Sequence, residues 1–123
     1  MATVYTQAGE EKVVDLIDGV SAAHLDVANA KIGWGTGAGT AAKADTTLFT
    51  EASEARVAAA VTQPTADKNQ WVATLTADAG KTITNAGLFD AATAGNLIVK
   101  GDFAGIALST GDKIEFTISL EQT

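Results

Sequence analysis

The segment 82-TITNAGLFDAATAGNLIVKGDF-103 decides how this chain folds. It contains two runs of residues that favour β-structure, residues 83–89 and 96–100, and the small residues 90–95 separate them. Two such runs joined by a short loop that ends in a glycine are typical of a β-hairpin with a looped or bulged turn. Nothing in the segment has the pattern of a catalytic group, so it predicts a structural scaffold.

Alternating residue patterns predict further strands on both sides of this hairpin. Residues 55–61 and 71–77 alternate before the hairpin, and Pro64 is expected to end the first of these two strands. The clearest alternation follows the hairpin, where the apolar residues are Ile114, Phe116, Ile118 and Leu120. Strict alternation indicates an antiparallel strand with one buried and one solvated face. We expect this last strand to lie in the core sheet, next to the hairpin.

The N-terminal part contains the one helix that the sequence predicts, over residues 10–18. Its apolar residues, which share a face at helical spacing, are Val13, Val14, Leu16 and Ile17. Gly19 is expected to end the helix, because glycine readily adopts the left-handed conformation of a helix C-terminus. Residues 20–30 either extend the helix or form a loop that packs Leu25 and Val27 on the core.

Two further features complete the predicted architecture. Ile32 and Trp34 alternate in a strand that leads into the glycine-rich segment 33–39, and Leu48 and Phe49 are expected to pack on the core. The sequence therefore predicts a single, mainly β domain over residues 1–123. We expect an antiparallel β-sandwich or a small barrel with one short N-terminal helix. Residues 1–9 are a candidate N-terminal arm, since residues 2–7 could form a short strand or pair with an adjacent subunit.

Composition excludes several classes of function. The net charge of −7 and the pI near 4.4 argue against a nucleic-acid partner, because an acidic surface repels phosphates. The chain has no cysteine, so it has no disulfide and no cysteine-ligated metal. No signal peptide is evident, and no apolar run approaches the ~20 residues that a membrane span requires. We therefore expect no membrane partner, and a thin, alanine-rich core stabilised by further copies of the chain.

Two candidate sites for chemistry have stronger structural explanations. The glycine-rich segment 33–39 lacks both the helix of a dinucleotide fingerprint and the lysine of a phosphate loop, so we interpret it as a structural turn. His24 is the only histidine, and neither a zinc site nor a nucleophile elbow accompanies it. We expect it at the surface or near the end of the helix.

The acidic residues also have structural explanations. Glu51 or Glu54 is expected to form an ion pair with Arg56 at the start of a strand, rather than to act as one of the paired acids of a glycosidase. The acids in or beside turns are Asp90, Asp102 and Asp112. We interpret them as caps of backbone N–H groups, and calcium binding as a weaker alternative. With no assembled acid, base or nucleophile, the chain is not expected to be an enzyme and needs no cofactor.

Two groups of residues resemble stretches of small bacteriophage virion structural proteins, of the capsid-decoration and tail-collar-fibre types. The first comprises Ile32-Gly33-Trp34-Gly35-Thr36-Gly37, Asp45-Thr46-Thr47-Leu48, Glu51 and Arg56. The second comprises Asn85-Ala86-Gly87-Leu88-Phe89-Asp90, Gly95-Asn96-Leu97 and Gly111-Asp112-Lys113-Ile114. The resemblance extends from Ile32 to the C-terminus, although these proteins often have an acid at the position of Asn85. It implies a non-enzymatic, β-rich, symmetric virion protein made in the bacterial cytoplasm.

Three hypotheses follow from the residues and the resemblance together. The first is a capsid decoration, or cement, protein that binds the major capsid protein lattice on the capsid exterior as a homotrimer. The second is a structural protein of the tail, collar or fibre of the virion. The third is a carbohydrate-binding module in which Trp34 or Trp71 forms an exposed stacking platform.

Overall fold

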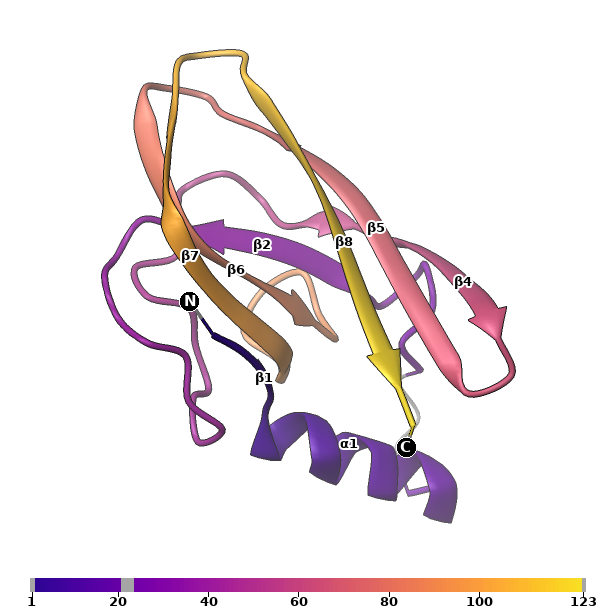
Figure 1. Ribbon diagram of the computed structural model, residues 1–123. Helices are drawn as coiled ribbons and strands as arrows, with labels where there is room; N and C mark the ends of the chain where they lie inside the picture. Colours follow the sequence, from indigo (N-terminus) through magenta and orange to yellow (C-terminus); the bar gives the residue numbers. More distant parts are fainter. Residues whose placement is uncertain (1, 21–23, 123) are drawn as a thin grey trace.

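The computed structural model describes residues 2–20 and 24–122, which form one helix and two antiparallel sheets (Figure 1). The elements are β1 (Thr3–Tyr5), α1 (Gln7–Asp18), β2 (Lys31–Gly35), β3 (Val57–Ala58), β4 (Ala60–Thr65), β5 (Lys68–Thr76), β6 (Lys81–Phe89), β7 (Leu97–Leu108) and β8 (Lys113–Glu121). The five-stranded sheet has the order β1-β7-β6-β2-β3, and the three-stranded sheet has the order β4-β5-β8. The predicted mainly β sandwich with one N-terminal helix is confirmed. Within the described residues the sheets do not close into a barrel.

The predicted hairpin is the β6–β7 pair at the centre of the larger sheet. Its strands pair in antiparallel register, with Leu88 opposite Val99, and the register shifts beside Phe89 at the turn. The Asp90 carboxylate accepts a hydrogen bond of 2.7 Å from the Asn96 N–H and so closes the loop. β7 extends past the predicted end at residue 100, because Lys81 to Ile83 of β6 continue to pair with its C-terminal half.

The last strand lies in the other sheet, so the prediction that it adjoins the hairpin is wrong. β8 pairs with β5 over its whole length, from Lys68 opposite Glu121 to Thr76 opposite Lys113. Its alternation is as predicted, and its inner side chains face the hairpin across the sandwich. The Phe116 ring lies 6.2 Å from the ring of Phe103 on β7. Alternation indicates which face of a strand is buried, and both sheets of a sandwich offer such a face.

The predicted strand over residues 55–61 is also wrong, because the chain changes sheets within it. β3 pairs with β2 in the larger sheet, and β4 pairs with β5 in the smaller one. Between them, Ala59 is buried and its N–H donates to the carbonyl of Ala30 over 3.0 Å. Pro64 lies inside β4 rather than ending the strand before it. β4 is an edge strand, where a residue without an N–H is tolerated.

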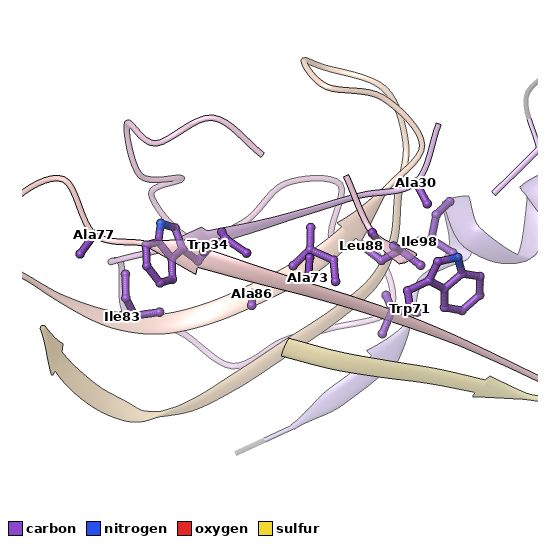
Figure 2. Close-up of a cluster of buried hydrophobic side chains, with 13 residues drawn as sticks. Ala30, Trp34, Trp71, Ala73, Ala77, Ile83, Ala86, Leu88 and Ile98 are labelled. Atoms are coloured by element: carbon purple, nitrogen blue, oxygen red, sulfur yellow. The ribbon is translucent and has the colours of Figure 1, made fainter. Parts of the chain in front are cut away.

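Two tryptophans, together with alanine and larger aliphatic side chains, fill the space between the sheets (Figure 2). Trp34 and Trp71 are both buried, at 1% and 2% exposure, and their indole N–H groups have partners. Trp71 Nε1 donates to the carbonyl of Leu25 over 2.9 Å, and Leu25 packs on the core as one of the two predictions for residues 20–30 requires. Val27 is 61% exposed, so its predicted burial is wrong. Residues 21–23 lie outside the described residues.

Helix α1 begins earlier than predicted and packs through a different face. Thr6 caps its N-terminus by accepting a 3.0 Å hydrogen bond from the Gly9 N–H, and Gly19, with φ of +74°, ends it as predicted. The predicted apolar face is wrong, because Val14 and Ile17 are 56% and 79% exposed. The Thr6 hydroxyl also donates to backbone carbonyls of β7. This anchor sets the start of α1 so that Gly9 and Lys12 face the sheet instead.

The N-terminal residues join the larger sheet. Of the two alternatives for residues 2–7, a strand is the one observed: Thr3 pairs with Gly101 and Tyr5 with Val99, both on β7 of the same chain. The Asp102 N–H extends this pairing by donating to the carbonyl of Ala2 over 2.8 Å. The candidate arm at residues 1–9 therefore includes an edge strand of its own subunit.

The glycine-rich segment lies directly against the backbone at Phe49 and Thr50. The Thr36 and Gly37 N–H groups donate to the carbonyls of Thr50 and Phe49, over 3.0 and 2.9 Å. A Cβ atom on Gly35 would lie 2.5 Å from the Phe49 carbonyl oxygen. Glycine therefore permits a close approach of two backbone segments at this point.

We expect Gly35→Ala to lower the free energy of unfolding by about 1–3 kcal/mol, because the added methyl group overpacks this contact. Chemical denaturation of both proteins measures the difference. Gly80→Ala is the matched control, since a Cβ there meets its nearest neighbour, the Leu108 carbonyl oxygen, at an ordinary 3.7 Å. Equal stability of Gly35→Ala and the unmodified chain would contradict the close-approach interpretation.

Candidate functional site

Arg56 and Glu51 form the ion pair that the sequence predicts. Arg56 Nε and its terminal nitrogen lie 2.7 and 2.9 Å from the two carboxylate oxygens of Glu51, which is a bidentate arrangement. The guanidinium also stacks on the Phe89 ring at 3.4 Å and donates to the carbonyls of Ala91 and Ala94 in the hairpin loop. Arg56 therefore fastens the β6–β7 loop to residues 51–56, and its role is structural.

Glu54 has different partners from those predicted. Its carboxylate pairs with Lys81 and accepts hydrogen bonds from Trp34 Nε1 at 3.1 Å and from the Asp78 N–H at 3.0 Å. Burial alone would raise the pKa of Glu54, but these donors together lower it to about 2. A carboxyl group with so low a pKa stays ionised near neutral pH and has no proton to give a substrate.

The lowered pKa of Glu54 predicts a pH-dependent contribution to stability. A depressed folded-state pKa stabilises the fold above the unfolded value of 4.5, and the contribution is lost as pH falls from there towards 2. We expect Glu54→Gln to lower the free energy of unfolding by about 2 kcal/mol at pH 7. The deficit should shrink between pH 5 and 2, as followed by urea denaturation.

Glu11→Gln, which alters an exposed carboxylate of α1, is the control and should show a small deficit at every pH. A Glu54→Gln deficit that stays constant down to pH 2 would mean that the charge of Glu54 does not contribute.

The remaining candidate residues do not assemble into a site. His24 is exposed, as predicted. Asp90 and Asp112 cap the N–H groups of Asn96 and Ser109, and Asp102 accepts a 2.7 Å hydrogen bond from the Ala41 N–H. That bond is the main cause of the lowered pKa of Asp102. Among the residues that the structure describes, no three metal-ligating acids or histidines come together.

The burial of both tryptophans overturns the carbohydrate-binding hypothesis in its proposed form. Trp34 lies between the two sheets, where its ring is nearly perpendicular to that of Phe116, with centroids 6.3 Å apart. Trp71 is covered by Leu25 and the rest of the core. A stacking platform requires an exposed ring face, and neither indole offers one.

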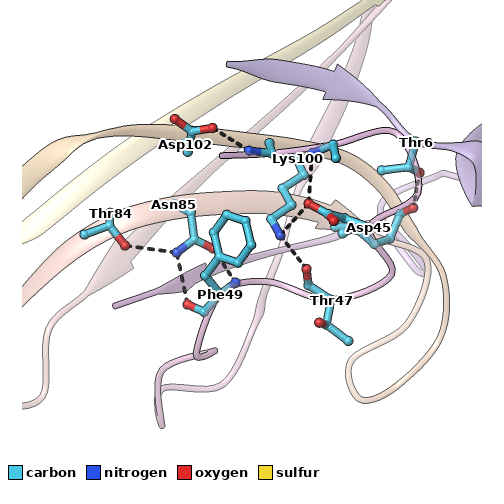
Figure 3. A network of polar contacts seen from close by, with 11 residues as sticks. Thr6, Asp45, Thr47, Phe49, Thr84, Asn85, Lys100 and Asp102 are labelled. Carbon is cyan, nitrogen blue, oxygen red and sulfur yellow. Dashed lines mark hydrogen bonds and ion pairs between the residues drawn. The ribbon is translucent and has the colours of Figure 1, made fainter. Parts of the chain in front are cut away.

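A buried polar network that sequence reasoning missed lies on the other face of the larger sheet (Figure 3). At its centre is Lys100, whose side chain is 1% exposed. Its ammonium lies 2.9 Å from the Asp45 carboxylate, 2.8 Å from the Thr47 carbonyl oxygen and 3.3 Å from the centroid of the Phe49 ring. A hydrogen bond from the Ala42 N–H and the contact with Lys100 lower the pKa of Asp45. The sequence does contain one indication that Lys100 is buried, because this lysine directly follows the apolar run Leu97-Ile98-Val99.

Asn85 continues the network on the neighbouring strand. Its side-chain oxygen accepts from the Phe49 N–H at 3.0 Å, and its nitrogen donates to the Phe49 carbonyl at 3.1 Å. The Asn85 amide thus pairs with both backbone groups of one residue, as a neighbouring strand would. The Thr84 hydroxyl donates to the Gly37 carbonyl beside it. Together these contacts hold residues 37–49 on the sheet, so the network is structural.

Lys100 and Asp45 differ in how well each tolerates the loss of its partner. Asp45→Asn leaves the buried ammonium without a counter-charge, and we expect a loss of about 3 kcal/mol in the free energy of unfolding. Lys100→Met leaves a carboxylate that is 24% exposed and can be hydrated, so we expect a loss of about 1 kcal/mol. Thermal or urea denaturation measures both.

The double variant, with both substitutions, should be more stable than Asp45→Asn alone, because it removes the orphaned charge. A larger loss for Lys100→Met than for Asp45→Asn would contradict this account of the network.

Comparison with known protein families identifies what kind of protein carries this scaffold. Residues 5–121 match the model of a family described as Podophage GP4 fiber I protein gp80. The chain belongs to this family of phage fibre proteins. The match extends from the end of β1 through the last residue of β8, so it covers almost the whole fold. No curated protein matches the chain.

Family membership resolves several of the sequence predictions. The fibre protein is a structural component of a phage virion, which confirms the resemblance to phage virion proteins. It is not an enzyme, because the family is one of structural proteins. In the described part of the chain, no helix is long and apolar enough to cross a membrane.

Proposed function

We propose that this chain is a rigid building block of a phage fibre, and that it works by contacts between its outer surfaces and other virion proteins. The observation that carries the proposal is the family match over residues 5–121. The match favours the fibre hypothesis over capsid cement on the major capsid protein lattice. The homotrimer stays a prediction from the sequence.

The internal contacts of the fold support the role of a rigid structural component. Polar residues that a binding site would offer to a ligand are instead used inside the molecule: Arg56 holds the hairpin loop, and Lys100 holds residues 45–49. Among the described residues, every buried side-chain nitrogen or oxygen has a hydrogen-bond partner. A closely packed domain with these internal hydrogen bonds and ion pairs resists deformation, as a building block that joins other proteins must.

Labelling of intact virions tests the proposal. Antibodies raised against the purified chain and coupled to gold should mark the fibres in electron micrographs of the phage that encodes it. The control is the same phage with the gene deleted, which should lose both the label and the fibres while its heads resist heating as before. Label spread over the capsid surface, with heads that release DNA at lower temperature after the deletion, would instead support the cement hypothesis.

A further inference from the structure

The two sheets have four edges, and three of them are poorly suited to pairing with another strand. β1 and β3, which end the larger sheet, have only three and two residues. β4 contains Pro64, and its register with β5 shifts between Thr62 and Thr65. Short strands, prolines and bulges are the devices by which proteins prevent association through sheet edges.

The fourth edge, β8, has none of these devices. It is nine residues long, contains no proline and pairs with β5 without a register shift. Its inner side chains, from Ile114 to Leu120, are only half-buried, although those opposite them on β5, such as Trp71 and Leu75, are buried. The difference lies in the neighbours, since β5 has a strand on each side and β8 has one on a single side. β8 therefore has the properties of an inner strand at an edge position.

A groove of about 250 Å³ adjoins this edge on the inner side of the sheet. Phe116 and Ile118 of β8 form one wall, and Val99 and Gly101 of β7 with Thr3 of β1 form the other. The inner side chains of a strand added beside β8 would point into this groove. Apart from Phe103, the residues of β1, β6 and β7 that line the groove are small or medium-sized and leave room for them.

In place of the homotrimer that the sequence predicts, we propose that β8 pairs with β8 of a second copy of this chain across a twofold axis. The other three end strands are blunted, and the part of β7 that extends past β1, residues 103–108, is shorter than β8 and lies beside a register shift in β6. The longest regular strand that a second copy can offer is therefore its own β8. An antiparallel pair centred on Thr117 is self-complementary: Lys113 lies opposite Glu121, and Glu115 lies opposite Ser119. On the inner face the same register places Ile114 opposite Leu120 and Phe116 opposite Ile118. The contact is isologous and joins two three-stranded sheets into one of six strands.

Engineered cysteines test this register directly, because the chain has no cysteine of its own. In a pair centred on Thr117, the two copies of that residue face each other at a distance that a disulfide spans. Thr117→Cys should therefore form a disulfide-linked dimer under mild oxidation, seen on a non-reducing gel. Thr62→Cys, on the exposed edge of β4, is the matched control and should stay monomeric.

The flanking positions test the direction and alignment of the strands. Glu115→Cys and Ser119→Cys should cross-link when the two variants are mixed, and neither should cross-link by itself, because only unlike positions face each other. Cross-linking of Glu115→Cys alone, or cross-linking of Thr62→Cys as fast as that of Thr117→Cys, would overturn the proposal.

Sedimentation of the unmodified chain, at a salt concentration near 0.15 M, provides the second test. We expect a dimer, with a dissociation constant that Lys113→Glu raises about tenfold, because two like-charged pairs replace two opposite pairs. The double variant Lys113→Glu/Glu121→Lys should restore the original value. A monomer at all concentrations, or a trimer, would overturn twofold pairing through β8. This inference concerns contact between copies and does not depend on where the chain lies in the virion.

Discussion

The buried ammonium group of Lys100 is the interaction on which the arrangement of this molecule most depends. A charge removed from water is costly unless it is paired and hydrogen-bonded, and here a carboxylate, a carbonyl and an aromatic ring provide that compensation. All three partners belong to residues 45–49, which have no regular secondary structure. Unless that segment lies on β7, the charge is unpaired, so the strand and the loop must be ordered together.

The larger sheet is consequently covered by two different kinds of contact. Towards the smaller sheet, β6 and β7 present apolar residues such as Ile83 and Val99, and burial of apolar area stabilises that layer. On the opposite face they present Asn85, Lys100 and Asp102, whose hydrogen bonds specify where the covering segment lies. Hydrogen bonds are directional, whereas apolar contacts are not. The polar face therefore fixes one position for a loop that apolar contacts alone would allow to lie in many positions.

The sequence predicted local structure well and long-range arrangement poorly, for a physical reason. Alternation in β8 and the small loop of the hairpin depend on neighbouring residues, and both predictions were right. Pairings between distant strands decide which sheet contains β8 and where residues 55–61 cross from one sheet to the other. No local sequence pattern contains that information. The buried face of α1 was missed because a contact between Thr6 and β7, more than 90 positions away, overrides the apolar pattern of the helix. Lys100 and Asn85 were missed because burial of a polar residue is specified by its partners.

The pairing of β1 with β7 also has a consequence for how the chain folds during synthesis. Thr3 pairs with Gly101 and Tyr5 with Val99, so β1 has no partner strand until the residues of β7 have left the ribosome. Contacts of such high sequence separation slow folding, because a long loop must close before they form. The larger sheet is therefore completed only after β7 has been synthesised. A chain that stops before β7 leaves β1 without a partner strand, so such a product lacks the edge to which the start of α1 is attached.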